Sequence, residues 1–223
     1  MRRLRDHGLS LFFGLLFLLA LLGQAVSGLA AYDNQQLATG GEPVSIWRYV
    51  TSSSFAVDVA ENWQSEYLQF FLFVLATVYL VQRGSTESKP LDRVGRESDR
   101  DQKVGRYAGP DSPRWAKVGG WRTALYARSL GTVMGLIFAG SWLAQSVAGR
   151  AAYNAEQLSE LSDPVSWAGY VTSADFWNRT LQNWQSEFLA VASMAVLSIY
   201  LRERGSPESK PVGAPHDSTG VEG

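Results

Sequence analysis

The pentapeptide Asn62-Trp63-Gln64-Ser65-Glu66 occurs a second time as Asn183-Trp184-Gln185-Ser186-Glu187. The two copies are 121 residues apart, and with that shift residues 9–90 align on residues 130–211 without a gap. About 36 of the 82 aligned pairs are identical, which is far above chance and identifies a tandem repeat. The repeat predicts that one structural unit is built twice along the chain.

Four apolar runs lie within the two copies, at Leu9–Val26, Tyr67–Val81, Leu130–Val147 and Phe188–Leu201. Each is near or just short of the roughly 20 residues that span a bilayer, and interfacial Trp side chains lengthen them. A mean hydropathy of -0.09 hides this segregation. We therefore predict an all-α integral membrane protein, with four transmembrane helices arranged as two parallel-repeat helical hairpins.

The first apolar run has a second interpretation. Arg2, Arg3 and Arg5 precede it and Ala-Val-Ser-Gly at 25–28 ends it, as in a secretory signal peptide. Its copy at Leu130–Val147 lies in the middle of the chain, where no signal peptide belongs. We therefore expect the first run to be retained as a span.

The basic residues predict the orientation. The loops at 27–62 and 148–183 contain only Arg48, Arg150 and Arg179, and the other 17 of the 20 basic residues lie on the opposite side of the spans. Lysine and arginine collect on the cytoplasmic side of a membrane protein. Both termini and the segment between the hairpins of this multi-pass protein are therefore expected in the cytoplasm.

Composition divides the chain into four parts: a first hairpin at 1–90, a disordered or basic cytoplasmic linker at 91–121, a second hairpin at 122–211 and a disordered tail at 212–223. Within the first hairpin we expect helices at Leu9–Ala38, ended by Gly40-Gly41, and from about Ser52 to Gly84. Pro43–Ser52 and Pro164–Ser173 would close the hairpins, each with a helical turn.

The end of the linker mixes basic and aromatic residues. This pattern suits a segment that rests on the anionic inner leaflet, and it equally suits an ordinary basic flank whose long side chains reach past apolar neighbours. The residues are Arg114, Trp115, Lys117, Trp121, Arg122, Tyr126 and Arg128.

The repeated pentapeptide is the first candidate site. Asn62 and Glu66 are four residues apart and share a helix face, and a carboxylate at the edge of an apolar run needs a partner. One hypothesis is a structural hydrogen-bond cluster between the helices of a hairpin; the other is a proton or cation site formed by Glu66 and Glu187. The candidate outer polar cluster comprises Gln24, Tyr32, Asn62, Glu66, Gln145, Tyr153, Asn183 and Glu187.

A second motif, Arg-Gly-Ser-x-Glu-Ser-Lys-Pro, ends each copy. It predicts either a docking site for a partner or phosphate-bearing ligand, or a simple helix stop with Gly84 as the cap; the strand-to-helix context of a phosphate loop is missing. Thr86 changes to Pro207 between the copies, so the halves are not strictly equivalent. The motif residues are Arg83, Gly84, Ser85, Glu87, Lys89, Arg204, Gly205, Ser206, Glu208 and Lys210.

Composition argues against several classes of chemistry. The sequence has no cysteine, and His7 and His216 are its only histidines, both near the ends. We therefore expect no metal, no cofactor and no enzymatic activity. The net charge of -1 gives no reason to expect a nucleic-acid partner.

The two paired motifs resemble an uncharacterised prokaryotic membrane-protein family, the domain of unknown function number 6766, over nearly the whole chain. The resemblance implies a bacterial inner-membrane protein and implies no known activity. We therefore favour a non-enzymatic structural or interaction component of the membrane over a small transporter or channel with a carboxylate site. The lipid bilayer is the expected partner, and a homo-oligomer or a membrane-protein partner stays open.

Overall fold

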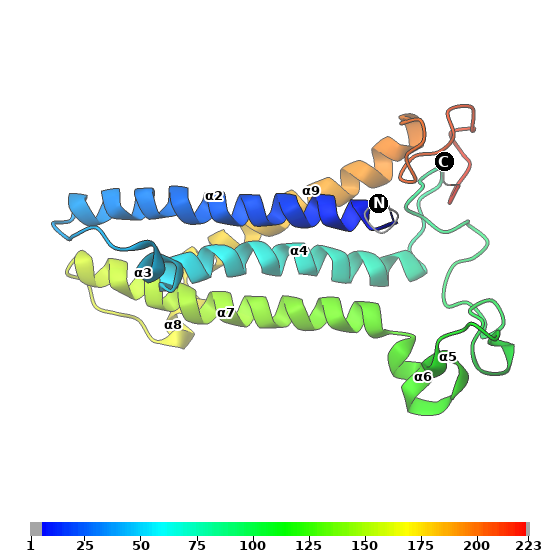
Figure 1. Cartoon of the computed structure of the whole chain (residues 1–223), viewed down its shortest axis with the longest axis horizontal. Helices are drawn as coiled ribbons and strands as arrows, with labels where there is room; N and C mark the ends of the chain where they lie inside the picture. Colours follow the sequence, from blue (N-terminus) through cyan, green and yellow to red (C-terminus); the bar gives the residue numbers. More distant parts are fainter. Residues whose placement is uncertain (1–5, 222–223) are drawn as a thin grey trace. The chain divides into compact units, whose positions relative to one another are not determined.

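A computed structural model describes residues 6–221, which leaves Arg2, Arg3 and Arg5 outside the described residues. Every regular element within the described residues is helical, and none is a strand (Figure 1). The helices are α2 (Gly8–Ala38), α3 (Ile46–Val50), α4 (Ser53–Tyr79), η1 (Gly105–Tyr107), α5 (Arg114–Lys117), α6 (Gly120–Tyr126), α7 (Ser129–Ser159), α8 (Trp167–Val171) and α9 (Ala174–Tyr200).

The chain divides into two compact units. The first comprises Met1–Ala60 and Leu143–Phe176, and the second comprises Glu61–Trp142 and Trp177–Gly223. The first unit holds α2, both short helices α3 and α8, and the helix ends beside them. The second holds the remaining lengths of α4, α7 and α9 with both copies of the two motifs.

Two of the described helices are long and apolar enough to cross a membrane, namely α2 and α7, each of 31 residues. The α2 helix buries none of its residues, and its Leu and Phe side chains are exposed. The α4 and α9 helices have 27 residues each, but charged side chains such as Glu61 and Arg179 interrupt their first halves. The long helices therefore fall into two pairs: α2 and α7, each with a long apolar stretch, and α4 and α9, each with charged residues in its first half.

The corner of the first hairpin is a tyrosine packed on a glycine. After α2, the chain turns at Gly40, which has a φ of +82°. It returns through α3, whose cap Ser45 accepts a hydrogen bond from the Arg48 N–H. Tyr49 is buried against α2, with its ring centroid 5.5 Å from that of Tyr32, and a Cβ atom at Gly28 would overlap its hydroxyl group. The glycine lets α3 dock on α2 (Figure 1).

The second hairpin has the same corner in the first unit. Tyr170 is fully buried, its ring lies 5.6 Å from that of Tyr153, and a Cβ atom at Gly149 would overlap its hydroxyl group. The backbone N–H of Val165 donates to Asn154 at 2.8 Å. The aligned bond in the first hairpin runs from Val44 to Asp33, also at 2.8 Å. Either Asp or Asn serves, because the bond requires only a side-chain carbonyl oxygen.

In the second unit, α4 packs closely on α7. A Cβ atom at Gly135 would meet the ring of Phe71, so a glycine again permits close approach. Further along α7, the Trp142 ring lies 6.2 Å from that of Trp177 and 5.9 Å from that of Trp184. Small residues and aromatic rings therefore form the contacts of α7 with α4 and of α7 with α9, as expected for helices that pack in lipid.

The structure differs from the sequence-based expectation at three places. The α4 helix ends at Tyr79 instead of Gly84, because the Gln82 N–H bonds to the Ser88 hydroxyl group instead of continuing the helix. The linker at 91–121, expected to be disordered or basic, contains η1, α5 and the start of α6. The tail, expected to be disordered over 212–223, is hydrogen-bonded through Thr219 to Gly84 and through His216 to Lys210, one residue in each copy of the second motif.

Candidate functional site

The repeated pentapeptides lie on α4 and α9 in the second unit, and the two helices bind each other there. The Trp184 Nε1–H donates to the Gln64 side-chain oxygen at 2.8 Å, and Gln64 is fully buried. One turn earlier, Arg179 forms an ion pair with Glu61 at 3.2 Å. We call these two interactions the α4–α9 motif contact. A polar side chain from each motif copy therefore takes part in helix packing.

Differences between the two copies make the ion pair possible. In the alignment Arg179 stands at the position of Asp58, and Glu61 stands at the position of Gln182. Two strictly identical copies would therefore lack this charge pair.

The two pentapeptides have the same local geometry and different surroundings. Ser65 donates to the Asn62 carbonyl at 2.9 Å, and Ser186 donates to the Asn183 carbonyl at 2.8 Å. However, Gln64 and Ser65 are buried, whereas their counterparts Gln185 and Ser186 are exposed. Identical sequence therefore forms an inner motif on α4 and an outer motif on α9.

The predicted outer polar cluster is divided between the two units. Gln24, Tyr32, Gln145 and Tyr153 belong to the first unit, and the other four residues belong to the second. Tyr32 and Tyr153 pack on the corner tyrosines, and Gln145 is fully buried whereas Gln24 is half-buried. The tyrosines thus serve as packing residues of the hairpin corners.

The remaining four residues of that cluster lie on α4 and α9. Asn183 donates to the Arg179 carbonyl at 2.9 Å, along its own helix. Glu66 is exposed and Glu187 is half-buried, and the two carboxylates are close enough for the charge of Glu66 to act on Glu187. The structure therefore brings Glu66 and Glu187 into electrostatic range.

Each Arg-Gly-Ser-x-Glu-Ser-Lys-Pro motif forms a compact loop beyond its helix. In the first copy the Gln82 N–H donates to Ser88 at 2.9 Å, and in the second the Glu203 N–H donates to Ser209 at 2.9 Å. The glycine of each copy has a φ of +84°, a left-handed conformation that favours glycine. Gly84 is therefore a loop glycine and not the helix cap predicted from the sequence.

The first loop contacts the second loop and the last turns of α9. The hydroxyl groups of Ser85 and Ser198 are 3.2 Å apart, and Thr86 donates to the Glu208 carbonyl at 3.3 Å. A Cβ atom at Gly84 would collide with the His216 carbonyl in the tail, so Gly84 must lack a side chain as well as adopt a positive φ. Arg83 and Arg204 are both exposed.

Lys210 is the most enclosed charged side chain of the second loop, with 1 % of its surface exposed. Its ammonium group donates to backbone carbonyls of Gly84 at 2.7 Å and His216 at 2.8 Å, and to those of Pro215 and Ser218 at longer range. Burial lowers the pKa of Lys210, and the charge of Arg202 lowers it further while Asp217 opposes the shift. Lys210 thus joins the first loop to the tail.

The aligned lysine of the first loop has a different role. The Lys89 ammonium lies 3.2 Å from the Glu97 carboxylate and 3.2 Å from the Gly95 carbonyl oxygen. Its hydrogen bond lowers the pKa of Glu97, and a bond from Gln102 lowers it further. Lys89 therefore fastens the linker, whereas Lys210 fastens the tail.

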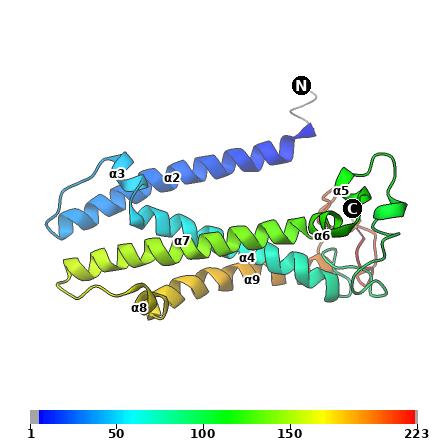
Figure 2. The same cartoon turned by 90° about the horizontal axis from the view of Figure 1, so that it is seen from below.

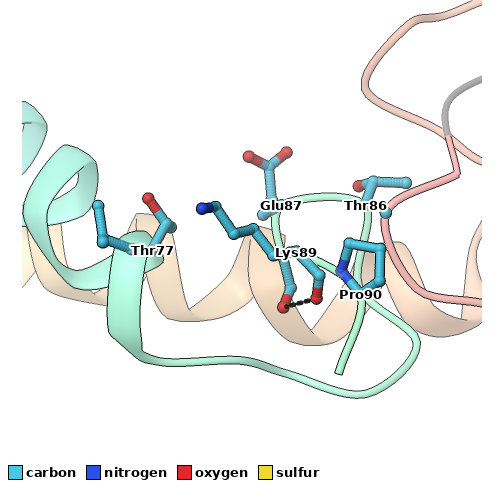
Figure 3. Close-up of a pocket in the computed structure, with 8 residues that line it drawn as sticks. Thr77, Thr86, Glu87, Lys89 and Pro90 are labelled. Atoms are coloured by element: carbon cyan, nitrogen blue, oxygen red, sulfur yellow. Dashed lines mark hydrogen bonds between the residues drawn. The ribbon is translucent and has the colours of Figure 1, made fainter. Parts of the chain in front are cut away.

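A hollow of about 390 Å³ opens beside the first loop (Figure 3). Its charged side chains are Glu87 and Lys89, and Lys89 is engaged with Glu97. An anionic ligand would have to compete with that carboxylate, so the hollow is poorly suited to phosphate. Its lining residues are Thr77, Val78, Thr86, Glu87, Ser88, Lys89, Pro90 and Gly220.

Comparison with known proteins places this arrangement in a family. The sequence model described as "Domain of unknown function (DUF6766)" matches residues 1–221, which include both hairpins, both pentapeptides and both loops. The chain belongs to the DUF6766 family. This match confirms the resemblance that the sequence motifs indicate. No curated protein and no solved structure matches the chain significantly.

The residues of this DUF6766 protein limit the chemistry that it can carry out. Within residues 6–221 no three His, Cys, Asp or Glu side chains are grouped so as to hold a metal ion. The best-formed polar features are the α4–α9 motif contact and the carbonyl cage around Lys210. In both, polar groups of the protein bond to one another, but the buried side-chain nitrogen of Gln64 has no hydrogen-bond partner within the described residues.

Several residues of these features were not predicted as site residues from this DUF6766 sequence. The corner tyrosines Tyr49 and Tyr170 could have been found, because they are identical at the repeat spacing and lie opposite glycines that are also identical. His216 and Thr219 could not, because the tail has no copy in the repeat. Ser198 could not either, because its partner Ser85 lies 113 residues away in the sequence.

Proposed function

We propose that the chain is a four-span membrane protein with both termini and the linker in the cytoplasm of a bacterium. Support comes from α2 and α7, each of which contains an apolar stretch long enough to cross a membrane, and from the exposed Leu and Phe side chains of α2. An apolar surface of that extent is stable only against lipid or another apolar partner. The α4 and α9 helices are the two further spans, each with its apolar stretch in the second half, at Tyr67–Tyr79 and Phe188–Tyr200.

We further propose a non-enzymatic structural or interaction role for this protein in the inner membrane. The observation that carries the proposal is the α4–α9 motif contact, in which Gln64 meets Trp184 and Glu61 meets Arg179. Functional polar groups in membrane helices face a cavity or a permeation path. Here the motif residues face one another, which suits a rigid pair of helices that presents its outer surface to a partner or to a second copy of the chain.

A carboxylate site for a proton or cation is the second candidate function. Its support is the electrostatic proximity of Glu66 and Glu187, since two neighbouring carboxylates attract a positive charge. The exposure of Glu66 weakens this candidate, because a permeating ion needs an enclosed path through the membrane.

Ion flux separates the two functions. The purified full-length chain is reconstituted into liposomes, and proton, sodium and potassium fluxes are compared with those of protein-free liposomes. The structural role predicts no flux above that background. Flux that Glu66→Gln and Glu187→Gln abolish, while Gln185→Ala leaves it intact, would overturn the structural role in favour of the carboxylate site.

A further inference from the structure

The helices α5 and α6 form a small folded unit immediately before α7, with α6 ending at Tyr126 and α7 beginning at Ser129. Ala116 and Thr123 are buried between the two short helices, and Thr123 donates to the Trp115 carbonyl at 2.6 Å. Figure 2 shows α5 and α6 next to each other before α7. We call the segment 113–128 the basic knuckle; Ala116 and Thr123 form its interior, and its other large side chains face outward.

The outer surface of the basic knuckle carries large apolar side chains. Trp121 is 69 % exposed, and Val118 and Leu125 are exposed as well. The ring of Trp115 lies 6.5 Å from that of Trp121, so the two indoles share one region of this surface. Water alone is an unfavourable environment for several neighbouring apolar groups of this size.

The same surface is strongly basic. Arg114, Lys117, Arg122 and Arg128 are all exposed, and no acidic residue lies between Asp111 and Glu156. The Arg122 guanidinium lies 5.5 Å from the centre of the Trp121 ring, which places charge and indole side by side. Upstream, by contrast, the basic residues of 92–101 alternate with acidic ones. Positive charge is therefore concentrated on the knuckle and not spread along the linker.

We propose that the basic knuckle docks on the anionic phospholipid headgroups of the membrane that α7 enters. Indole rings settle at the level of the headgroups, and nearby Lys and Arg are attracted to anionic lipid. The two residues between α6 and α7 keep the knuckle next to the bilayer. The inference rests on the four-span proposal, because it requires α7 to cross the membrane.

A single fluorophore tests the proposal, since the chain has no cysteine of its own. The full-length variant Val118→Cys carries an environment-sensitive dye, and the matched variant Asp111→Cys carries the same dye in the linker outside the knuckle. Both are reconstituted into phosphatidylcholine vesicles with or without phosphatidylglycerol. The dye at 118 should shift to the blue and become shielded from an aqueous quencher only in the anionic vesicles, and the dye at 111 should not.

Charge variants identify the cause. Arg114→Gln, Lys117→Gln and Arg122→Gln together should lower the docked population at least about tenfold, since each basic residue near an anionic surface contributes on the order of a fivefold preference. The control removes the same number of charges upstream, with Arg93→Gln, Arg96→Gln and Arg100→Gln, and should leave the dye signal at 118 unchanged. The proposal would be overturned if the dye at 118 gave the same signal in both kinds of vesicle. It would also be overturned if both triple variants lost the same fraction of the docked population.

The same samples separate this inference from the proposed function. Resistance to alkaline carbonate extraction reports integration of the chain into the bilayer. A chain that integrates but shows no lipid-dependent signal overturns the docking surface alone. A chain that is extracted by carbonate overturns the four-span proposal, and the docking surface that depends on it falls with it.

Discussion

At the residue scale, the glycines opposite the corner tyrosines are the positions where a single methyl group matters most. Gly28 and Gly149 each lie where a Cβ atom would overlap a buried tyrosine hydroxyl group, whereas Gly23 on the same helix as Gly28 has open space around it. Burial raises the pKa of Tyr49, with Asp58 and Tyr32 adding to the shift, so its phenol stays neutral at physiological pH. The packing of this corner therefore depends on steric fit and not on a charge on Tyr49.

We expect Gly28→Ala to lower the free energy of unfolding by about 1–3 kcal/mol through overpacking. Gly23→Ala should be neutral or slightly stabilising, because alanine favours a helix over glycine. Thermal unfolding in detergent measures both. Adding Tyr49→Phe to Gly28→Ala should restore part of the loss by removing the colliding oxygen. No rescue, together with equal effects of the two alanines, would contradict the packing argument.

The turn after each long helix offers a matched pair of residues. Gly40 has a φ of +82°, and its aligned residue Leu161 has a φ of +61° although it carries a side chain. A left-handed conformation costs a non-glycine residue about 1–2 kcal/mol. Leu161→Gly should therefore stabilise the second hairpin, and Gly40→Leu should destabilise the first. The unfolding temperatures of the two variants, measured by calorimetry, should shift in opposite directions.

At the scale of the elements, the two pentapeptides provide an internal control for burial. Gln64 on α4 is fully buried and accepts a hydrogen bond from Trp184, whereas Gln185 on α9 is exposed. Gln64→Ala should lower the free energy of unfolding by about 1–3 kcal/mol, since it leaves the indole N–H without its acceptor. Gln185→Ala should change it by less than about 0.5 kcal/mol. Equal losses in chemical denaturation would show that α9 buries its motif as well.

The two lysines make a comparable pair at the loops. Lys210→Gln should free the tail, because the ammonium group that joins Gly84 to His216 and Ser218 is lost. Hydrogen exchange at Gly220, whose N–H donates to the Ser85 carbonyl at 3.0 Å, should quicken about tenfold or more. Lys89→Gln should leave that amide unchanged and release the linker at Gly95 instead. Faster exchange at Gly220 in both variants would contradict separate roles.

At the scale of the whole molecule, the number of spans decides which segments lie on which side. Single cysteines at Glu42, Asp99 and Glu160, all exposed positions, report this when intact cells are treated with an impermeant thiol reagent. Four spans with a cytoplasmic N-terminus predict labelling at 42 and 160 but not at 99. If only α2 and α7 crossed, 42 and 99 would be labelled and 160 would not. The pattern of three labels therefore distinguishes the two topologies.

Much of the local structure could be predicted because it depends on residues that are neighbours in the chain. The long helix expected at Leu9–Ala38 is observed at Gly8–Ala38, and the helical turns expected within Pro43–Ser52 and Pro164–Ser173 are α3 and α8. The predicted end of α4 is wrong by several residues, because the hydroxyl group of Ser88, six residues after Gln82, accepts a hydrogen bond from the Gln82 N–H. The apolar periodicity of the sequence does not reveal a side chain that competes for a backbone N–H in this way.

The candidate sites were predicted as sets of residue types, and only in part as sets of contacts. Sequence by itself determined that the chain belongs to one family, that it repeats, and where its helices and loops recur, since these properties lie in contiguous residues and their spacing. The tertiary structure alone decided that Gln64 is buried while Gln185 is exposed, and that Lys210 is caged by carbonyls while Lys89 pairs with Glu97. Identical segments carry identical local preferences, but burial and partners come from chain segments far away, and these differ between the two copies.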